Sequence, residues 1–303
     1  MAMTVPVSAE KLSALQPVLL GAIPRSKPHY RIDPITPLFS LLLLLLFCGC
    51  LPSRVHAADN LFNSGAVIKE EFSRLSEEGK LFFKAPADPY LAESGALAGV
   101  FTLTYILDKD IRSDLAGSHS GVLRGLTDFG NAASNPVLHI GVAAALYGAG
   151  VAAESPQFMQ LGEELGEAVF LADAATFMLK GAIGRGRPYS GDGNSRYRPF
   201  QFRDGYDSLP SMHTASSFAI AHVVASKTKS LPVKIICYAA AGFVGFSRVY
   251  QGKHWASDAV LGAAIGELAG DAVTRYRASK PGGLTVAPLS MDGTPSLAVI
   301  GKF

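Results

Sequence analysis

The sequence predicts an all-α fold, a bundle of about six helices with an N-terminal signal or anchor helix and a short C-terminal β-like tail. Three observations favour this fold. Apolar segments of about fifteen to twenty residues recur from Leu91 onward. Alanine and glycine dominate these segments, which lets helix backbones approach closely. The 303 residues are 49% hydrophobic and 17% charged, which is enough apolar material for a sizeable core.

Residues 1–57 are interpreted as a signal sequence or a membrane anchor. An apolar run of about fourteen residues, from Leu38 to Leu51, fits a signal-peptide core and is short for a membrane span. Val55-His56-Ala57 fits a small-x-small cleavage site loosely. The protein is therefore expected to be exported, to the periplasm or to the cytoplasmic membrane with its functional site facing outward.

Residues 58–278 form the predicted helical domain. Its first part, 58–90, is amphipathic and is expected to form a helix that ends near Pro86 and Pro89. Six further segments are expected to be helical: 91–107, 137–152, 161–181, 214–228, 231–247 and 258–276. Asp108-Lys109-Asp110 is expected to end the first of them. Residues 279–303 form a predicted tail, in which two alternating runs around Asp292-Gly293 indicate a weak hairpin.

Polar residues inside the apolar segments leave the environment of the bundle open. Glu163, Glu167 and Asp173 are examples, and each would cost a few kcal/mol in a bilayer unless it were paired. The bundle is either soluble or embedded in a membrane with these groups facing inward.

Composition argues against two kinds of partner. The net charge is only +2, and no basic run with interleaved aromatics occurs, so no nucleic acid is expected. The three cysteines and seven histidines show neither Cys-x-x-Cys nor His-x-x-x-His spacing, so neither a metal site nor a cofactor is predicted.

The first chemically informative stretch holds Lys180 and Arg187, seven residues apart and therefore close to two helical turns. Gly184 and Gly186 weaken the helix between them, and Pro188 stops it. An ammonium group and a planar guanidinium fork suit a tetrahedral oxyanion. The alternative is a solvated basic helix end that complements the helix dipole.

The second stretch runs from Ser208 to Thr214. Pro210 and Ser211 precede a helix rich in small residues, which is a helix-start signal. A turn there points backbone N–H groups and a serine hydroxyl toward an anion, with His213 beside them. His213 could equally be a capping or core histidine.

The third stretch carries Arg248, His254 and Asp258. If the segment is helical, Asp258 lies one turn beyond His254 and can accept its imidazole N–H. That bond would leave the other ring nitrogen available as a nucleophile. The alternative is an incidental pair in which Asp258 only stabilises a helix N-terminus.

The three stretches read Lys-x6-Arg-Pro, Pro-Ser-x-His and Ser-Arg-x5-His-x3-Asp, in that order. This pattern resembles the type 2 phosphatidic acid phosphatase (PAP2) / vanadium haloperoxidase superfamily, in particular its exported bacterial members. The resemblance covers roughly residues 90–280 and implies an acid phosphatase/haloperoxidase-like helical bundle. Where the family usually has glycine between the serine and the histidine, this chain has Met212.

The resemblance also implies a role for each residue. Lys180, Arg187 and Arg248 would bind the phosphate oxygens, helped by Ser211 and the backbone of Met212. His254 would attack phosphorus and become a phosphohistidine, and Asp258 would orient it. His213 would protonate the leaving alcohol and later activate water.

The implied function is a metal-independent phosphatase for phosphomonoesters on small molecules or lipids, with a lipid phosphate or an isoprenyl diphosphate as candidate substrates. One alternative is a vanadate-dependent haloperoxidase, in which His254 would ligate vanadate. Another is an inactive family member with a binding or structural role, for which Met212 is the only support. The linker 189–209 either folds onto the bundle or lines the mouth of the site with its arginines and aromatic residues.

Overall fold

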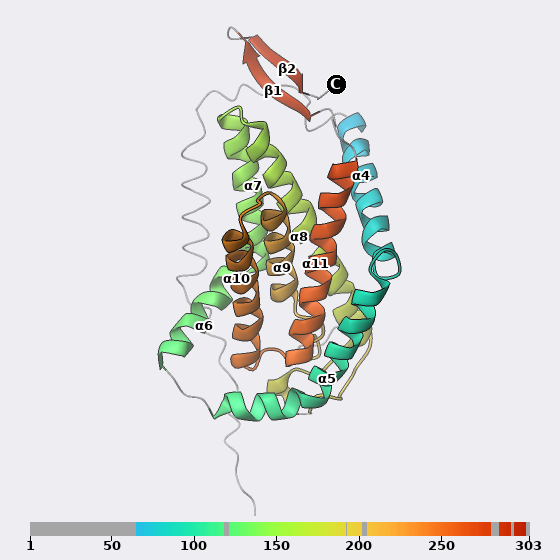
Figure 1. Cartoon of the computed structure of the whole chain (residues 1–303), viewed down its shortest axis with the longest axis vertical. Coiled ribbons are helices and arrows are strands. Elements are labelled where there is room, and N and C mark those ends of the chain that lie inside the picture. The colour runs from blue at the N-terminus through green and yellow to red at the C-terminus, as the bar shows by residue number, and fades with distance from the viewer. Residues whose placement is uncertain are drawn as a thin grey trace, which may run out of the picture. The chain divides into compact units, whose positions relative to one another are not determined.

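The computed structural model describes residues 65–117, 121–191, 193–201, 205–279, 285–291 and 294–300. The described residues form eight α-helices and two strands, labelled as in Figure 1. The helices are α4 (Gly65–Lys84), α5 (Leu91–Ala116), α6 (Gly121–Ala133), α7 (Pro136–Ala152), α8 (Pro156–Ile183), α9 (Met212–Ser226), α10 (Leu231–Tyr250) and α11 (Ala256–Ser279). Residues 1–57, for which a signal sequence or anchor is predicted, lie outside the described residues.

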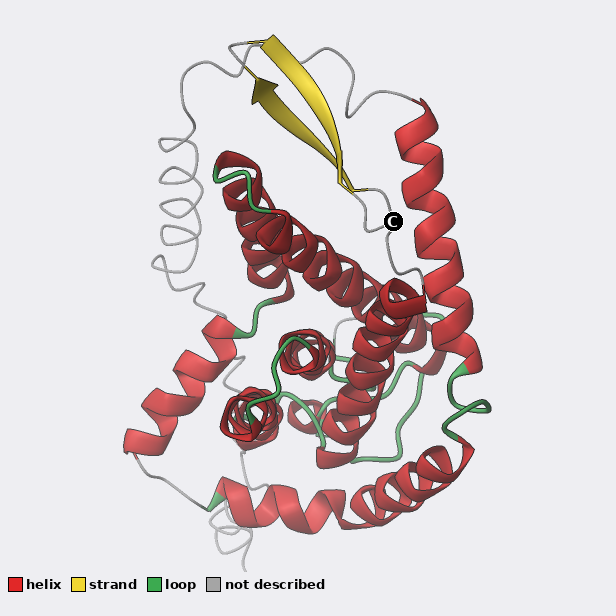
Figure 2. Cartoon of the chain, turned by 45° about the horizontal axis from the view of Figure 1, so that its top comes forward, coloured by secondary structure: helices red, strands yellow, loops and turns green. Residues whose placement is uncertain are grey.

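The predicted all-α class is confirmed, and Figure 2 shows helices throughout with strands confined to one pair. Strands β1 (Thr285–Met291) and β2 (Thr294–Ile300) occupy the two runs for which the sequence predicts a hairpin. They pair antiparallel, with Thr285 opposite Ile300 and Met291 opposite Thr294.

The end of α5 and the whole of α6 are the main differences from the prediction. Helix α5 continues through Asp108-Lys109-Asp110 to Ala116, because Asp108 is a buried acceptor and not a solvated helix end. Helix α6 was not predicted. Its apolar residues Val122, Leu126 and Phe129 follow a helical spacing, but three glycines dilute the pattern.

The core lies where α8, α9 and α11 pack together, with α10 also against α9 and α7 also against α8. Its buried side chains are small, with alanines at most positions. They include Ala168, Ala172 and Ala175 of α8, Ala215, Ala219 and Val223 of α9, and Ile265, Ala269, Ala272 and Val273 of α11.

Glycines spaced four apart on α11 allow its close approach to α9. A Cβ added at Gly262 would lie 2.5 Å from the carbonyl oxygen of Ser211, and one at Gly266 would lie 2.1 Å from that of Ala215. Only a residue without a side chain fits such a distance. The glycines therefore fix the start of α9 against the start of α11.

Replacing Gly266 with alanine should lower the free energy of unfolding by about 1–3 kcal/mol, because the added methyl group forces the two helices apart. Thermal unfolding of the purified protein measures the loss. Gly79 of α4 is the matched control, because a Cβ there meets nothing within 4 Å. Gly79→Ala should be neutral or stabilising by up to about 1 kcal/mol. Equal melting temperatures for Gly266→Ala and wild type would contradict the close approach.

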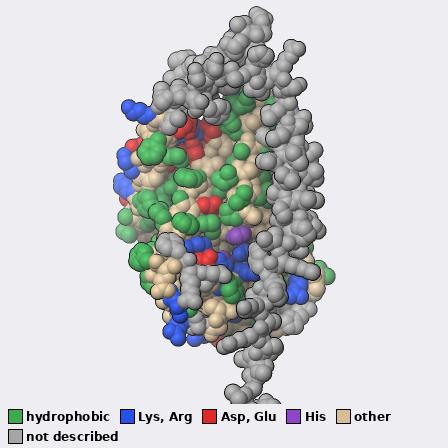
Figure 3. All heavy atoms as spheres, turned by 180° about the vertical axis from the view of Figure 1, so that it is seen from behind, with side chains coloured by type: hydrophobic (Ala, Val, Ile, Leu, Met, Phe, Trp, Pro, Cys, Tyr) green, Lys and Arg blue, Asp and Glu red, His purple; other side chains and the backbone are tan. Residues whose placement is uncertain are grey.

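Large apolar side chains are exposed over several helices of the described chain. By length and composition, α10 is the one described helix that could cross a membrane alone, and α6 with α7, bent by 57°, would be a second span. Figure 3 shows one face on which hydrophobic side chains cover much of the surface between charged ones. The exposed residues include Val100, Leu103 and Ile106 of α5, Val122 and Phe129 of α6, Val137 of α7, Phe170 and Phe177 of α8, and Leu231, Ile235 and Ile236 of α10.

Candidate active site

Helix ends bring the three predicted stretches together. Helix α8 carries Lys180 in its last turn and ends at Gly184, whose φ of 62° and close approach to Arg198 exclude a side chain. Arg187 follows, immediately before the short 3-10 helix Pro188–Ser190. Ser211 is the N-cap of α9, and Arg248 lies in the last turn of α10.

Hydrogen bonds between these segments fix them to one another. The backbone N–H of Ser211 donates to the carbonyl of Asp258 at 3.0 Å. Lys180 Nζ donates to the carbonyl of Asp207 at 2.5 Å, and Arg187 Nη1 donates to the carbonyl of Lys253 at 3.1 Å. The ends of α8, α9 and α10 and the start of α11 therefore meet at one site.

His254 is the best-defined group in this site. It is 1% exposed, and its Nδ1 lies 2.7 Å from the carbonyl oxygen of Ser208. Because a carbonyl can only accept a hydrogen bond, Nδ1 must carry the proton. A neutral His254 ring therefore keeps its lone pair on Nε2.

Asp258 does not accept that proton directly, which corrects the geometry expected from the spacing. Its Oδ2 lies 3.6 Å from His254 Nδ1, beyond hydrogen-bond range. The same oxygen accepts the hydroxyl of Ser208 at 2.5 Å and the backbone N–H of Trp255 at 2.8 Å. Asp258 therefore holds the residues on both sides of the imidazole, and it orients His254 through Ser208.

Arg185 completes this arrangement and was missed by sequence reasoning. It is fully buried, and it donates from Nη1 to Asp258 Oδ1 at 2.6 Å and from Nη2 to Asp108 Oδ2 at 2.7 Å. Ser257 joins them, because its N–H and its hydroxyl donate to the two oxygens of Asp108 at 2.9 and 2.6 Å. The available signal was an acid within an apolar segment, Asp108, which needs a buried partner.

The cationic side chains share one region with both histidines. Burial, followed by the charges of Lys180, Arg187 and Arg248, lowers the pKa of His254 well below its usual value. Burial and then the neighbouring positive charges, of which Arg248 is the strongest, lower the pKa of His213 to about 2. Both rings are therefore neutral near pH 7 while no anion offsets these charges.

Ser211 and Met212 start the helix that presents His213. Ser211 is fully buried, and its Oγ accepts the hydroxyl of Thr214 at 2.8 Å. Met212 is the first residue of α9 and is partly exposed. The first N–H groups of a helix lack intrahelical acceptors, so the start of α9 suits an anion.

The structure thus brings together all of the residues that the sequence singles out: Lys180, Arg187, Ser211, Met212, His213, Arg248, His254 and Asp258. The described part of the linker folds onto α5, in line with one expectation for it, and its Tyr189 also lies beside Arg187 and Lys253 of the site. Asn194 Nδ2 donates to the carbonyl of Tyr105 at 2.9 Å, and Tyr197 donates to the Tyr105 hydroxyl at 3.0 Å.

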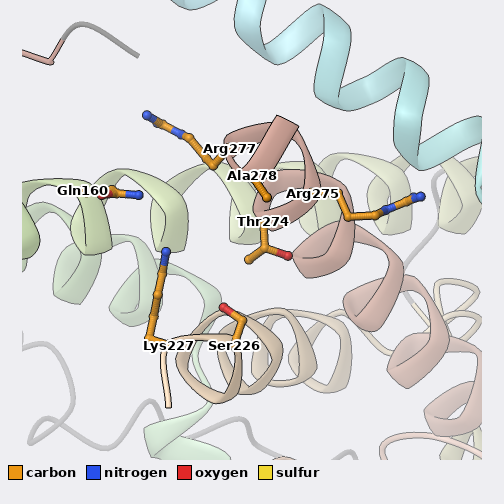
Figure 4. Close-up of a pocket in the computed structure, with 7 residues that line it drawn as sticks. All are labelled: Gln160, Ser226, Lys227, Thr274, Arg275, Arg277 and Ala278. Atoms are coloured by element: carbon orange, nitrogen blue, oxygen red, sulfur yellow. The ribbon is translucent and has the colours of Figure 1, made fainter. Parts of the chain in front are cut away.

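A separate cavity of about 420 Å³ lies at the other end of α9 and α11. Figure 4 shows its lining residues Gln160, Ser226, Lys227, Thr274, Arg275, Arg277 and Ala278. His213 and Ser226 lie at opposite ends of α9, about 20 Å apart at 1.5 Å per residue. Lys227 pairs with Glu164, Arg275 with Asp271 and Arg277 with Glu163. The cavity is therefore distinct from the site of the two histidines, and its cations are already neutralised.

Comparisons with known proteins agree with this site. Residues 164–280 match the model of the PAP2 superfamily. The chain is 28% identical over 244 residues to "Lipid A 1-phosphatase" of Porphyromonas gingivalis. That match covers 77% of this chain and 49% of the relative, so the chain spans about half the length of that protein.

Two solved structures are similar at a lower level. One is a crystal structure of Aquifex aeolicus LpxE, with 22% identity, a TM-score of 0.46, and coverage of 56% of this chain and 96% of that one. The other is a transmembrane PAP2 type phosphatidylglycerolphosphate phosphatase from Bacillus subtilis, with 18% identity, a TM-score of 0.45, and coverage of 61% and 95%. All of the predicted site residues fall within the segment that matches the family model. Through residues 164–280, the chain is similar to the PAP2 superfamily.

Proposed function

We propose that the chain is a metal-independent phosphatase that hydrolyses phosphomonoesters through a phosphohistidine at His254. The observation that carries the proposal is the hydrogen bond from His254 Nδ1 to the Ser208 carbonyl, which leaves Nε2 as the basic ring nitrogen beside fixed cations. Lys180, Arg187 and Arg248 supply the charge neutralisation that phosphoryl transfer requires.

In the first step, the Nε2 lone pair of His254 attacks phosphorus and the bond to the alcohol oxygen breaks. His213 gives a proton to that oxygen. In the second step, His213 takes a proton from water and the water oxygen attacks phosphorus. The bond from phosphorus to His254 Nε2 then breaks, and inorganic phosphate is released. A bound phosphate dianion offsets the nearby cations and raises the pKa of His213 from its value of about 2, which lets this ring act as an acid.

The substrate class that fits best is a lipid phosphomonoester, with an isoprenyl diphosphate as the second candidate. The exposed apolar residues of α5, α6 and α10 support contact with a membrane. The relative from Porphyromonas gingivalis is named for hydrolysis of a lipid phosphate. We place the enzyme outside the cytoplasm, at the cytoplasmic membrane with its site facing outward.

The direct test compares phosphate release from phosphatidic acid in detergent micelles with release from p-nitrophenyl phosphate, using the full chain and EDTA. Release from both in EDTA, with the lipid favoured in kcat/KM, is expected. Quenching in alkaline denaturant should trap a phosphoenzyme that is stable in base and is lost on acid treatment. If no phosphate is released, or if EDTA abolishes the release, the proposal is wrong. Halide oxidation that depends on added vanadate and peroxide would instead support the haloperoxidase alternative.

Lys180 gives a pH prediction for the same assay. Burial and then the charge of Arg187 lower the pKa of Lys180 to about 7. Above that pH the free enzyme loses one of its phosphate-binding cations, so kcat/KM should fall on the alkaline side. In Lys180→Arg the guanidinium stays protonated, so this fall should move to higher pH. The measurement is kcat/KM from pH 5 to 9 for both proteins, and superimposable profiles would contradict the assignment.

A further inference from the structure

Asp207 engages two of the cations assigned to the phosphate. Its carboxylate accepts two hydrogen bonds from Arg187, Nε to Oδ1 and Nη2 to Oδ2, each 2.6 Å long. The backbone carbonyl oxygen of Asp207 accepts a hydrogen bond from Lys180 Nζ. Nothing in the sequence motifs points to this residue, because it precedes the Pro-Ser-x-His stretch.

The contact has the geometry that a phosphate would use. A guanidinium binds a carboxylate or a phosphate best through two parallel N–H bonds. Asp207 occupies the Nε and Nη2 edge of Arg187, and Nη1 donates to the carbonyl of Lys253. A phosphate oxygen that approaches this edge meets a carboxylate already in place.

The charge of Asp207 is also maintained. Burial raises its pKa, but the hydrogen bonds and charge of Arg187, with the charge of Lys180, lower it to about 2. Because Arg187 is one of the cations assigned to the phosphate, its hydrogen bonds put the carboxylate beside the proposed phosphate position. At any pH near neutrality it is therefore an anion.

The side chain can leave this position without disturbing the fold around it. It is 43% exposed, whereas Arg187 is 13% exposed. The next residue, Ser208, is fully buried and donates its backbone N–H to the carbonyl of Arg185 at 3.0 Å. Rotation of the Asp207 side chain toward solvent therefore leaves the segment that holds His254 in place.

We propose that Asp207 is an internal competitor of the phosphate group for Arg187. The Asp207 carboxylate leaves Nε and Nη2 of Arg187 when the phosphate of the substrate binds, and it returns when inorganic phosphate departs. The inference rests on the proposed function. The cost of displacing Asp207 weakens the binding of inorganic phosphate, and this promotes release of the product.

The test is Asp207→Asn, which keeps the size of the side chain and removes its charge. The probes are inorganic phosphate and vanadate, measured as competitive inhibitors of p-nitrophenyl phosphate hydrolysis and by calorimetric titration. The inhibition constant of phosphate should fall about tenfold or more, and KM should fall with it. Asp114→Asn, an exposed residue of α5, should match wild type.

Two outcomes would overturn the inference. An unchanged inhibition constant would mean that Asp207 does not compete, and a higher one would mean that it positions Arg187 for phosphate. Asp207→Ser should show the same tightening and replaces Asp207→Asn if that variant does not fold. If wild type hydrolyses no phosphomonoester, the proposed function fails, and titration with phosphate still measures the competition. If wild type is active and the inhibition constant of phosphate is the same in wild type and in the Asp207 variants, only this inference fails.

Discussion

Replacing His254 with alanine should lower kcat by at least about 10³-fold, because the nitrogen proposed to attack phosphorus is removed. The buried ring is held by Ser208, and α9 and α11 are held together elsewhere by their glycines, so the fold should survive. Steady-state kinetics and trapping of the phosphoenzyme by an alkaline quench measure the result. No phosphoenzyme should form in this variant.

The matched control is His222→Gln. His222 lies on α9 near its far end, where its ring contacts Glu267 at 2.8 Å and Thr274 at 3.2 Å. Its replacement should leave kcat within about threefold of wild type, because no reacting group is touched. Retention of more than about a tenth of wild-type kcat in His254→Ala would exclude His254 as the nucleophile.

A double variant separates the two histidines. If His213 acts only in the steps that His254 begins, His213→Ala should add little to the loss already caused by His254→Ala. Additive losses would instead show that His213 works independently of the phosphohistidine. The comparison requires only the two single variants and the double variant in the same assay.

Replacing Arg185 with leucine should lower the free energy of unfolding by about 3–5 kcal/mol. Arg185 is the guanidinium that joins Asp108 and Asp258, all three fully buried. Its removal leaves two carboxylates uncompensated in the interior, which is a large cost among single substitutions. Denaturant unfolding measures the loss, and a change below about 1 kcal/mol would contradict the pairing.

A second replacement identifies the cause. Asp108→Asn removes one of the two charges, so the double variant Arg185→Leu/Asp108→Asn should be less destabilised than the sum of the single changes. Activity should not return with stability, because Asp258 still lacks the partner that fixes it beside Ser208. Recovery of both together would show that Arg185 has no part in orienting His254.

Much of the site could be predicted from sequence because its determinants are local. The all-α class follows from apolar periodicity and small residues, and the confirmed helices α7 to α11 follow from the same pattern. The spacing of Lys180 to Arg187 and of His254 to Asp258 marks groups that a helix end or a turn can present together. Residue type and spacing also distinguish the histidine that has a nearby acid from the one that does not.

Other features depend on contacts between distant segments. Spacing suggested that Asp258 binds His254 directly, but the imidazole proton goes to Ser208, which lies 46 positions earlier. The triplet at Asp108 read as a helix end, although its carboxylate is buried against Arg185, 77 positions away. A buried charge can be recognised only once its surroundings are known, because the same residue is unremarkable in water.

The sequence by itself therefore determined the helical class, the family pattern and the candidate reactive groups, since each of these depends on short-range order along the chain. The tertiary structure decided which oxygen holds His254, how Arg185 supports Asp258, and that Asp207 already occupies Arg187. These outcomes depend on where the ends of α8, α9, α10 and α11 meet, and the close contact of α9 with α11 at Gly262 and Gly266 sets part of that geometry.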